Sequence, residues 1–159
     1  MKTAIVPGSF DPITSGHLDI IKRASVLFDS VVVGVAKNVA KTPMFTTDER
    51  VALVKKATGD IPNVSVEEFD SLLVEFAKEK GAHVIVKGLR AVSDFEHEFQ
   101  MAQLNRELND TVETMFMMAS PEYAYLSSSS MREIAEYGET VKGLVPPVVE
   151  EALKNKFSS

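Results

Sequence analysis

The sequence contains no cysteine, and this absence removes two classes of site from consideration. Without thiols the chain can form neither a disulfide framework nor a zinc site with thiolate ligands. Disulfides mark oxidising compartments, so a chain that has none suits a reducing one. We therefore expect a cytoplasmic location.

Basic residues are in short supply, because 17 Lys and Arg stand against 23 Asp and Glu and leave a net charge of −6. Nucleic-acid binding and membrane-surface binding both require extended basic surface. We therefore expect neither a nucleic acid nor a membrane as a partner. If the protein binds phosphates, its positive charge must be concentrated locally.

Long apolar runs are missing as well, since no stretch approaches the roughly 18 residues that a membrane span requires. The first residues, Met-Lys-Thr, lead directly into a short apolar strand instead of the core of a signal peptide. The chain has 159 residues, of which 45% are hydrophobic, and this is enough to bury one core. We expect one soluble domain over residues 1–159.

Short β-branched runs alternate with segments of helical periodicity, which indicates an α/β fold with a parallel sheet and helices on both faces. The pattern predicts five strands, at residues 3–6, 31–35, 64–69, 83–86 and 113–117. It predicts helices at residues 16–28, 47–57, 72–80, 93–108 and 129–137, and a last one after Pro146-Pro147. Five strands are enough for a small doubly wound sheet, in which ligands bind beyond the carboxyl ends of the strands.

The first predicted strand is followed by turn residues, Pro7 to Asp11, and then by Thr14-Ser15-Gly16-His17 at the start of a helix. Helix N-termini attract phosphates through free N–H groups and the helix dipole. Gly8 would let the backbone pass close to a ligand, and Ser9 offers a hydroxyl. His17 could donate to a phosphate oxygen, although a histidine alone at a helix start is more often a solvated residue.

Phosphate-compatible side chains recur at three further strand ends. They are Lys37 and Lys41 after the second strand, Lys87 and Arg90 around Gly88-Leu89 after the fourth, and Ser127 to Ser130 with Arg132 after the fifth. Each has an ordinary explanation by itself, as a solvated surface cation or a helix N-cap. Their clustering at the strand ends of an acidic chain favours an anion site.

Several well-known motifs are missing. The sequence has neither a Walker P-loop nor a G-x-G-x-x-G fingerprint, which disfavours a P-loop NTPase and a standard dinucleotide oxidoreductase. It also shows no Ser-His-Asp order and no H-E-x-x-H pair, and His83 and His97 lack metal-ligand spacing. The phosphate site must therefore be of another kind.

Two signatures resemble those of the nucleotidyltransferase superfamily. The run Pro7 to Pro12 with Thr14-x-Gly16-His17 is similar to its T/H-x-G-H signature. Leu126-Ser127-Ser128-Ser129 with Arg132 is similar to its second signature, I-S-S/T-x-x-x-R/K. The resemblance implies a Rossmann-like fold.

Two further segments narrow the resemblance to the phosphopantetheine adenylyltransferases of bacteria. They are Lys41-Thr42-Pro43-Met44-Phe45 and Gly88 to Glu96, and the likeness extends from Lys2 to about Lys156. It implies transfer of the adenylyl group of ATP to 4′-phosphopantetheine, which yields dephospho-coenzyme A and pyrophosphate. It also implies a Mg²⁺ requirement, a homohexamer and feedback inhibition by coenzyme A.

The resemblance also assigns roles to individual residues, with His17 as transition-state stabiliser and Lys41 and Arg90 as further catalytic residues. The implied ATP-binding residues are Ser9, Phe10, His17, Gly88, Leu89, Arg90, Glu98, Tyr123, Ala124, Tyr125, Leu126, Ser127, Ser128, Ser129 and Arg132. The implied acceptor-binding residues are Ser9, Lys41, Leu73 and Lys87. No residue is assigned as a metal ligand, because Mg²⁺ is expected to bind through phosphates and water.

Two of these positions depart from the commonest residues of the family. Ser9 stands where threonine is frequent and keeps the hydroxyl, whereas Lys87 stands where arginine is frequent. Lysine keeps the charge but loses the planar fork of a guanidinium. We expect weaker geometric control of the acceptor phosphate and the same reaction.

Two alternative functions remain open at this point. The first is another nucleotidyltransferase, for instance a cytidylyl- or nicotinamide-mononucleotide transferase, against which the Lys41 segment and the Gly-Leu-Arg-Ala-Val stretch argue. The second is a non-catalytic regulator that binds adenylates. Such a regulator would use the same glycines and serines but would have no use for His17.

Overall fold

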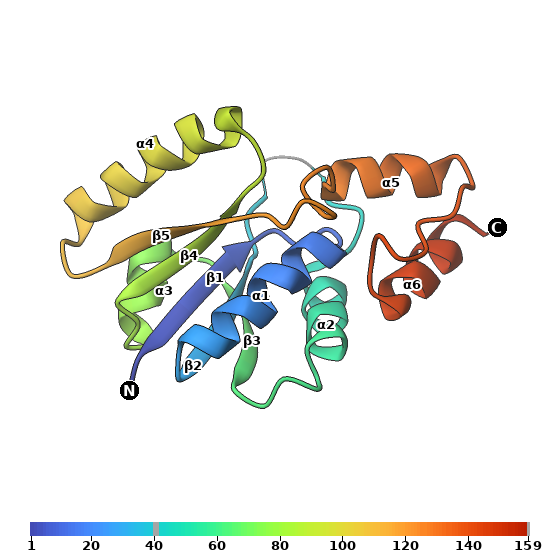
Figure 1. The fold of residues 1–159 in the computed structure, drawn as a ribbon. Helices are drawn as coiled ribbons and strands as arrows, with labels where there is room; N and C mark the ends of the chain where they lie inside the picture. The colour runs from blue at the N-terminus through green and yellow to red at the C-terminus, as the bar shows by residue number, and fades with distance from the viewer. Residues whose placement is uncertain (40–41, 159) are drawn as a thin grey trace.

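A five-stranded sheet forms the centre of the molecule in the computed structural model, which describes residues 1–39 and 42–158 (Figure 1). Its strands are β1 (Thr3–Gly8), β2 (Ser30–Ala36), β3 (Val64–Phe69), β4 (Val84–Leu89) and β5 (Glu113–Met118). They lie in the order β3-β2-β1-β4-β5, and all neighbouring pairs are parallel. The strand order reverses between β1 and β4, which makes this point the expected ligand site of the sheet.

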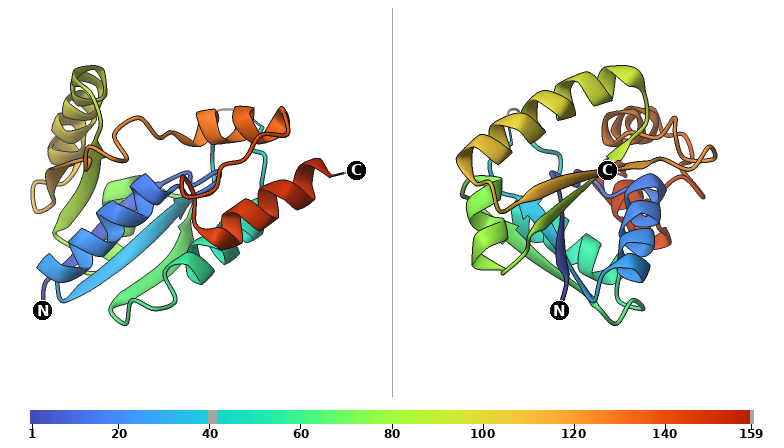
Figure 2. Two further views of the ribbon diagram at one scale, coloured as in Figure 1. Left: turned by 45° about the vertical axis from the view of Figure 1, so that its right-hand side comes forward. Right: turned by 60° about the vertical axis from the view of Figure 1, so that its left-hand side comes forward.

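Six helices connect and cover the strands among the described residues. They are α1 (Ser15–Leu27), α2 (Thr47–Ala57), α3 (Leu73–Glu79), α4 (Val92–Leu108), α5 (Ser128–Glu136) and α6 (Pro147–Phe157). Helices α1 and α2 lie on one face of the sheet and α3 and α4 on the other, while α6 packs against α2 and α5 (Figures 1 and 2). This arrangement confirms the predicted doubly wound, Rossmann-like α/β fold. No described helix is long and apolar enough to cross a bilayer.

Two apolar cores, one on each side of the sheet, explain why the strands read as continuous apolar runs. Along β1, Ala4 and Val6 face the core under α1 and α2, and Ile5 faces the core under α3. The run 31–35 of β2 is buried throughout because both of its faces are covered. The predicted strands and helices are all present, with bounds that shift by at most a few residues.

Local signals set several helix ends. Thr46 and Glu49 form a capping box at the start of α2, and Gly138 follows the end of α5 with a φ of 81°. Strand β4 runs to Leu89, so that Lys87 and Gly88 lie inside the strand instead of after it. Both still lie at the carboxyl edge of the sheet.

Gly34 of β2 lies where the sheet meets the stacked rings of Phe69 and Phe76, whose centroids are 4.8 Å apart. A Cβ atom at Gly34 would stand 2.8 Å from a ring carbon of Phe76. We predict that Gly34→Ala lowers the free energy of unfolding by about 1–3 kcal/mol, the usual cost of overpacking a core. Urea denaturation followed by circular dichroism measures this change.

The matched control is Gly59→Ala, because a Cβ atom at Gly59 would make only ordinary contacts with backbone oxygens of α2. This variant should unfold at nearly the same urea concentration as the wild type. An unchanged midpoint for Gly34→Ala would show that the ring pair moves aside at no cost.

Candidate active site

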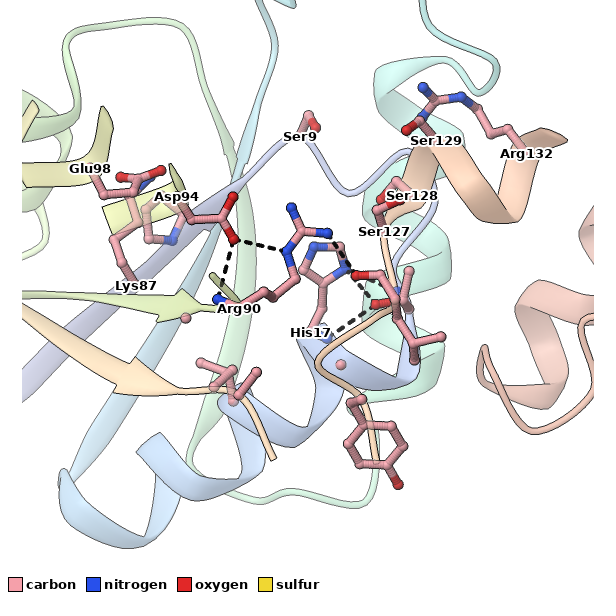
Figure 3. Close-up of a pocket in the computed structure, with 18 residues that line it drawn as sticks. Ser9, His17, Lys87, Arg90, Asp94, Glu98, Ser127, Ser128, Ser129 and Arg132 are labelled. Atoms are coloured by element: carbon pink, nitrogen blue, oxygen red, sulfur yellow. Dashed lines mark hydrogen bonds and ion pairs between the residues drawn. The ribbon is translucent and has the colours of Figure 1, made fainter. Parts of the chain in front are cut away.

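A cavity of about 420 Å³ opens at the strand-order reversal, between the carboxyl ends of β1 and β4 (Figure 3). It is lined from the β1–α1 loop, the start of α1, the end of β4, the inner face of α4 and the segment between β5 and α5. The predicted site residues that line it are Ser9, His17, Lys87, Gly88, Arg90, Glu98, Tyr123, Leu126, Ser127, Ser128, Ser129 and Arg132. Segments far apart in the sequence thus meet at one edge of the sheet.

The remaining predicted site residues do not line this cavity. They are Phe10, Leu73, Leu89, Ala124 and Tyr125. Leu73 lies at the start of α3, where it packs against the core on that side of the sheet. Lys41 lies outside the described residues, so its predicted role stays a prediction.

Phe10 is held below the cavity by an unusual backbone conformation. Its φ is 49°, its side chain is 2% exposed, and its ring meets the His17 ring edge-on with centroids 5.1 Å apart. A Cβ atom at Gly8 would come within 3.0 Å of this ring. Gly8 therefore also makes room for Phe10, and its predicted role in letting a ligand pass close to the backbone stays a prediction.

His17 takes part in a capping box at the start of α1. The Thr14 hydroxyl accepts a hydrogen bond from the His17 N–H at 3.2 Å, and the Thr14 N–H donates to Nδ1 of His17 at 3.0 Å. Histidine thus takes the position that Glu or Gln usually occupies in this motif. Because Nδ1 accepts a hydrogen bond, the proton of the neutral ring lies on Nε2. The ring is therefore oriented as an Nε2–H donor.

The surroundings of His17 keep its ring uncharged. Burial, and second to it the positive charge of Arg90, lowers the pKa of His17 from 6.5 to about 4. The ring is therefore neutral in the free protein at neutral pH. A neutral imidazole can still donate from Nε2–H to an anionic oxygen.

Two ion pairs hold cations at the cavity wall (Figure 3). Arg90 contacts Asp94 at 3.2 Å, and Lys87 contacts Glu98 at 3.3 Å. The two carboxylates are four residues apart and therefore share one face of α4. Asp94 was not predicted as a site residue, although its spacing from Glu98 could have indicated it.

The predicted serine segment forms the N-terminus of α5. Ser127 is the N-cap and accepts a hydrogen bond from the Ser130 N–H at 3.1 Å, while Ser128 donates to the Pro12 carbonyl at 2.8 Å. Arg132 donates to the Asp11 carbonyl from the same helix. The N-termini of α1 and α5 both reach the cavity, so two helix dipoles favour an anion there.

A buried arginine, Arg50 of α2, connects the loops around the site. It is 1% exposed and donates to the carbonyl groups of Ser9 at 2.7 Å and Ala36 at 2.8 Å. Next to it, the carboxylate of Asp11 accepts from the backbone N–H groups of residues 44 and 45, both at 2.9 Å. These bonds tie the β1–α1 loop to the segment that follows β2. Neither role of Arg50 and Asp11 could be predicted from a sequence pattern.

Within residues 1–39 and 42–158, no three His, Cys, Asp or Glu side chains gather as a metal cluster. Asp94 and Glu98, which line the cavity, are engaged by Arg90 and Lys87. A divalent ion in the cavity would therefore draw most of its oxygen ligands from bound phosphates and water.

We predict that His17 remains a neutral Nε2–H tautomer between pH 7.5 and pH 5.5 and titrates with a pKa of about 4. Because this value lies below 6.5, the unfolded chain binds this proton more readily, and His17 costs stability as pH falls from 6.5 toward 4. Nitrogen-15 NMR of the imidazoles measures the tautomer and the titration. A His17→Gln variant assigns the signals, and a midpoint near 6.5 would contradict the geometry.

Comparisons with known proteins agree with the site. A family model described as cytidylyltransferase-like matches residues 5–134. The chain is 57% identical over 157 residues to the phosphopantetheine adenylyltransferase of Caldanaerobacter subterraneus subsp. tengcongensis, covering 99% of this chain and 98% of that protein. It is also 57% identical over 157 residues to that of Thermodesulfovibrio yellowstonii, covering 98% of each, and 52% identical over 158 residues to that of Geotalea daltonii, covering 99% and 98%. The chain belongs to the phosphopantetheine adenylyltransferase family.

Proposed function

We propose that the protein transfers the adenylyl group of ATP to 4′-phosphopantetheine, giving dephospho-coenzyme A and pyrophosphate in coenzyme A biosynthesis. The observation that carries this proposal is the cavity at the strand-order reversal of this family member. His17, Arg90 and the N-terminus of α5 meet in that cavity. The donors of this cavity suit a polyphosphate.

The reaction requires no nucleophile from the protein. A phosphate oxygen of the acceptor attacks the α-phosphorus of ATP, a new P–O bond forms, and the bond to pyrophosphate breaks with its electron pair. The attacking oxygen is already ionised near neutral pH, so no strong base is needed. The obstacle is repulsion between two anions, and catalysis consists of positioning and charge stabilisation.

The residues of the cavity divide these tasks. His17 donates from Nε2 to the α-phosphate as negative charge builds up there. Arg90, Arg132 and the N–H groups at the start of α5 hold the β- and γ-phosphates. Lys87 steers the phosphate of the acceptor, and Lys41 is proposed for the same task from the family resemblance.

We include Mg²⁺ in the proposal as an ion that neutralises phosphate charge. The carboxylates of the described cavity residues already pair with cations. The ion would therefore bind mainly to oxygens of the phosphates that the cavity holds. Coenzyme A would inhibit by competing for the same cavity, since it contains the skeleton of the product. A cytoplasmic location, where ATP is available, is part of the same proposal.

An assay of pyrophosphate release tests the function. We predict that the protein with Mg²⁺ releases pyrophosphate from ATP only when 4′-phosphopantetheine is present. His17→Ala should lower kcat by roughly 10² to 10³, the scale of losing one preorganised oxyanion donor, while the affinity for ATP falls far less. Calorimetry measures that affinity in parallel.

The matched control is His83→Ala, because His83 is exposed, does not line the cavity, and its ring is hydrogen-bonded to the Thr111 carbonyl. It should keep the activity of the wild type. Pyrophosphate release that depends on another acceptor would indicate a different nucleotidyltransferase activity. ATP binding without pyrophosphate release would indicate a regulator that binds adenylates. Equal losses of kcat and ATP affinity in His17→Ala would refute the proposed role of His17.

We also propose that the protein assembles as a homohexamer. Support comes from the large apolar side chains that α4 and the edge strand β5 leave exposed. They are Phe95, Phe99, Met101, Leu104, Leu108, Met115 and Met118. Exposed apolar side chains that form a patch mark a protein–protein contact.

Sedimentation velocity tests this assembly. We predict that the wild type sediments with six times the mass of one chain and that Leu104→Glu shifts it to smaller species, because a charge would be buried at the contact. Val26→Glu is the control, since Val26 is 85% exposed on α1, away from α4. A monomeric wild type would contradict the proposal.

A further inference from the structure

The cavity proposed for polyphosphates is lined by two carboxylates, Asp94 and Glu98. A carboxylate repels a phosphate, so its presence at this position costs binding energy. Both are partly shielded, with side chains 29% and 22% exposed. Neutral residues could line the cavity without this cost. The reason for the two carboxylates must therefore be sought in the contacts that they make.

The contacts of Asp94 differ in kind from those of Glu98. One oxygen of Asp94 accepts two hydrogen bonds from Arg90, from the backbone N–H and from Nε, both at 3.2 Å. Glu98 makes one contact of 3.3 Å with Nζ of Lys87, a charge on a flexible stem. Asp94 therefore fixes an orientation, whereas Glu98 balances a charge.

A third bond completes the support of Arg90. Its NH1 donates to the carbonyl of Leu126 at 2.8 Å, directly before the serines that start α5. A guanidinium has five N–H groups, and Nε and NH1 use two of them here. The other three N–H groups have no partner among residues 1–39 and 42–158, and the bonds at Nε and NH1 fix the plane of the guanidinium. Arg90 is also close enough to His17 for its charge to lower the pKa of that ring.

We propose that Asp94 is a positioning residue for the adenylyl transfer: it holds the guanidinium of Arg90 so that its free N–H groups face the phosphates that bind beside His17. This inference rests on the function proposed above. Asp94 itself does not touch the substrate. Asp94 orients the guanidinium of Arg90 before ATP binds. The entropy lost by ordering this side chain is therefore smaller, both when ATP binds and when the transition state forms.

Two substitutions separate orientation from charge. Asp94→Asn keeps an oxygen that can accept both hydrogen bonds and removes only the charge, whereas Asp94→Ala removes the acceptor. We expect Asp94→Ala to lower kcat by roughly 10-fold to 100-fold, the scale of a misplaced catalytic group. Asp94→Asn should stay within about threefold of the wild type in kcat, because the orientation survives.

The matched control is Glu113→Ala. It also removes a carboxylate that pairs with an arginine, Arg106 at 2.9 Å, but this pair is exposed and far from the cavity lining. Its kcat should equal that of the wild type. An Asp94→Ala enzyme within threefold of the wild type would overturn the proposal, and so would an Asp94→Asn enzyme as impaired as Asp94→Ala.

A second readout does not depend on turnover. The Nε–H signal of Arg90 in nitrogen-15 NMR, assigned with an Arg90→Lys variant, should be sharp in the wild type and in Asp94→Asn and broadened in Asp94→Ala. A sharp signal in all three would overturn the positioning role. If the three proteins show these signals but the wild type releases no pyrophosphate, the proposed function fails. The conclusion that Asp94 orients Arg90 would still stand.

Discussion

The capping box between Thr14 and His17 is the interaction on which the site depends. It starts α1 at the cavity, so that the positive end of the helix dipole faces the space where phosphates are proposed to bind. It also fixes the imidazole, because Nδ1 accepts from the Thr14 backbone and only Nε2 can donate. One local motif therefore supplies both the position and the protonation state of the central donor.

Around this motif, the described cations that line the cavity each have a partner in the protein. Arg90 and Lys87 are both paired with carboxylates of α4, and Arg132 is bonded to the β1–α1 loop. The N-terminus of α5 adds potential from backbone dipoles, which need no counter-ion. The attraction for phosphate is thus local and oriented, which agrees with a net charge of −6.

Much of this could be predicted from the sequence, because the signals are local. Apolar runs such as 31–35 mark strands, and turn residues after them mark the edge where ligands bind. What sequence reasoning missed are contacts between distant segments. Arg50 looks like an ordinary helical arginine, and only the fold shows it bonded to Ser9 and Ala36. The close approach of the Phe10 ring to Gly8 is another such contact, which the turn residues of this loop do not indicate.

The two sides of the proposed reaction differ in how firmly the protein holds them. On the ATP side, Arg90 is bonded at Nε, at NH1 and through its own backbone, and it presents a planar fork. On the acceptor side, Lys87 makes a single ionic contact and presents a point charge. An in-line displacement needs a fixed α-phosphorus, because the leaving group must depart opposite the attacking oxygen. The acceptor phosphate can attack through any of its equivalent oxygens, so a rigid ATP site and a more adaptable acceptor site suit the same reaction.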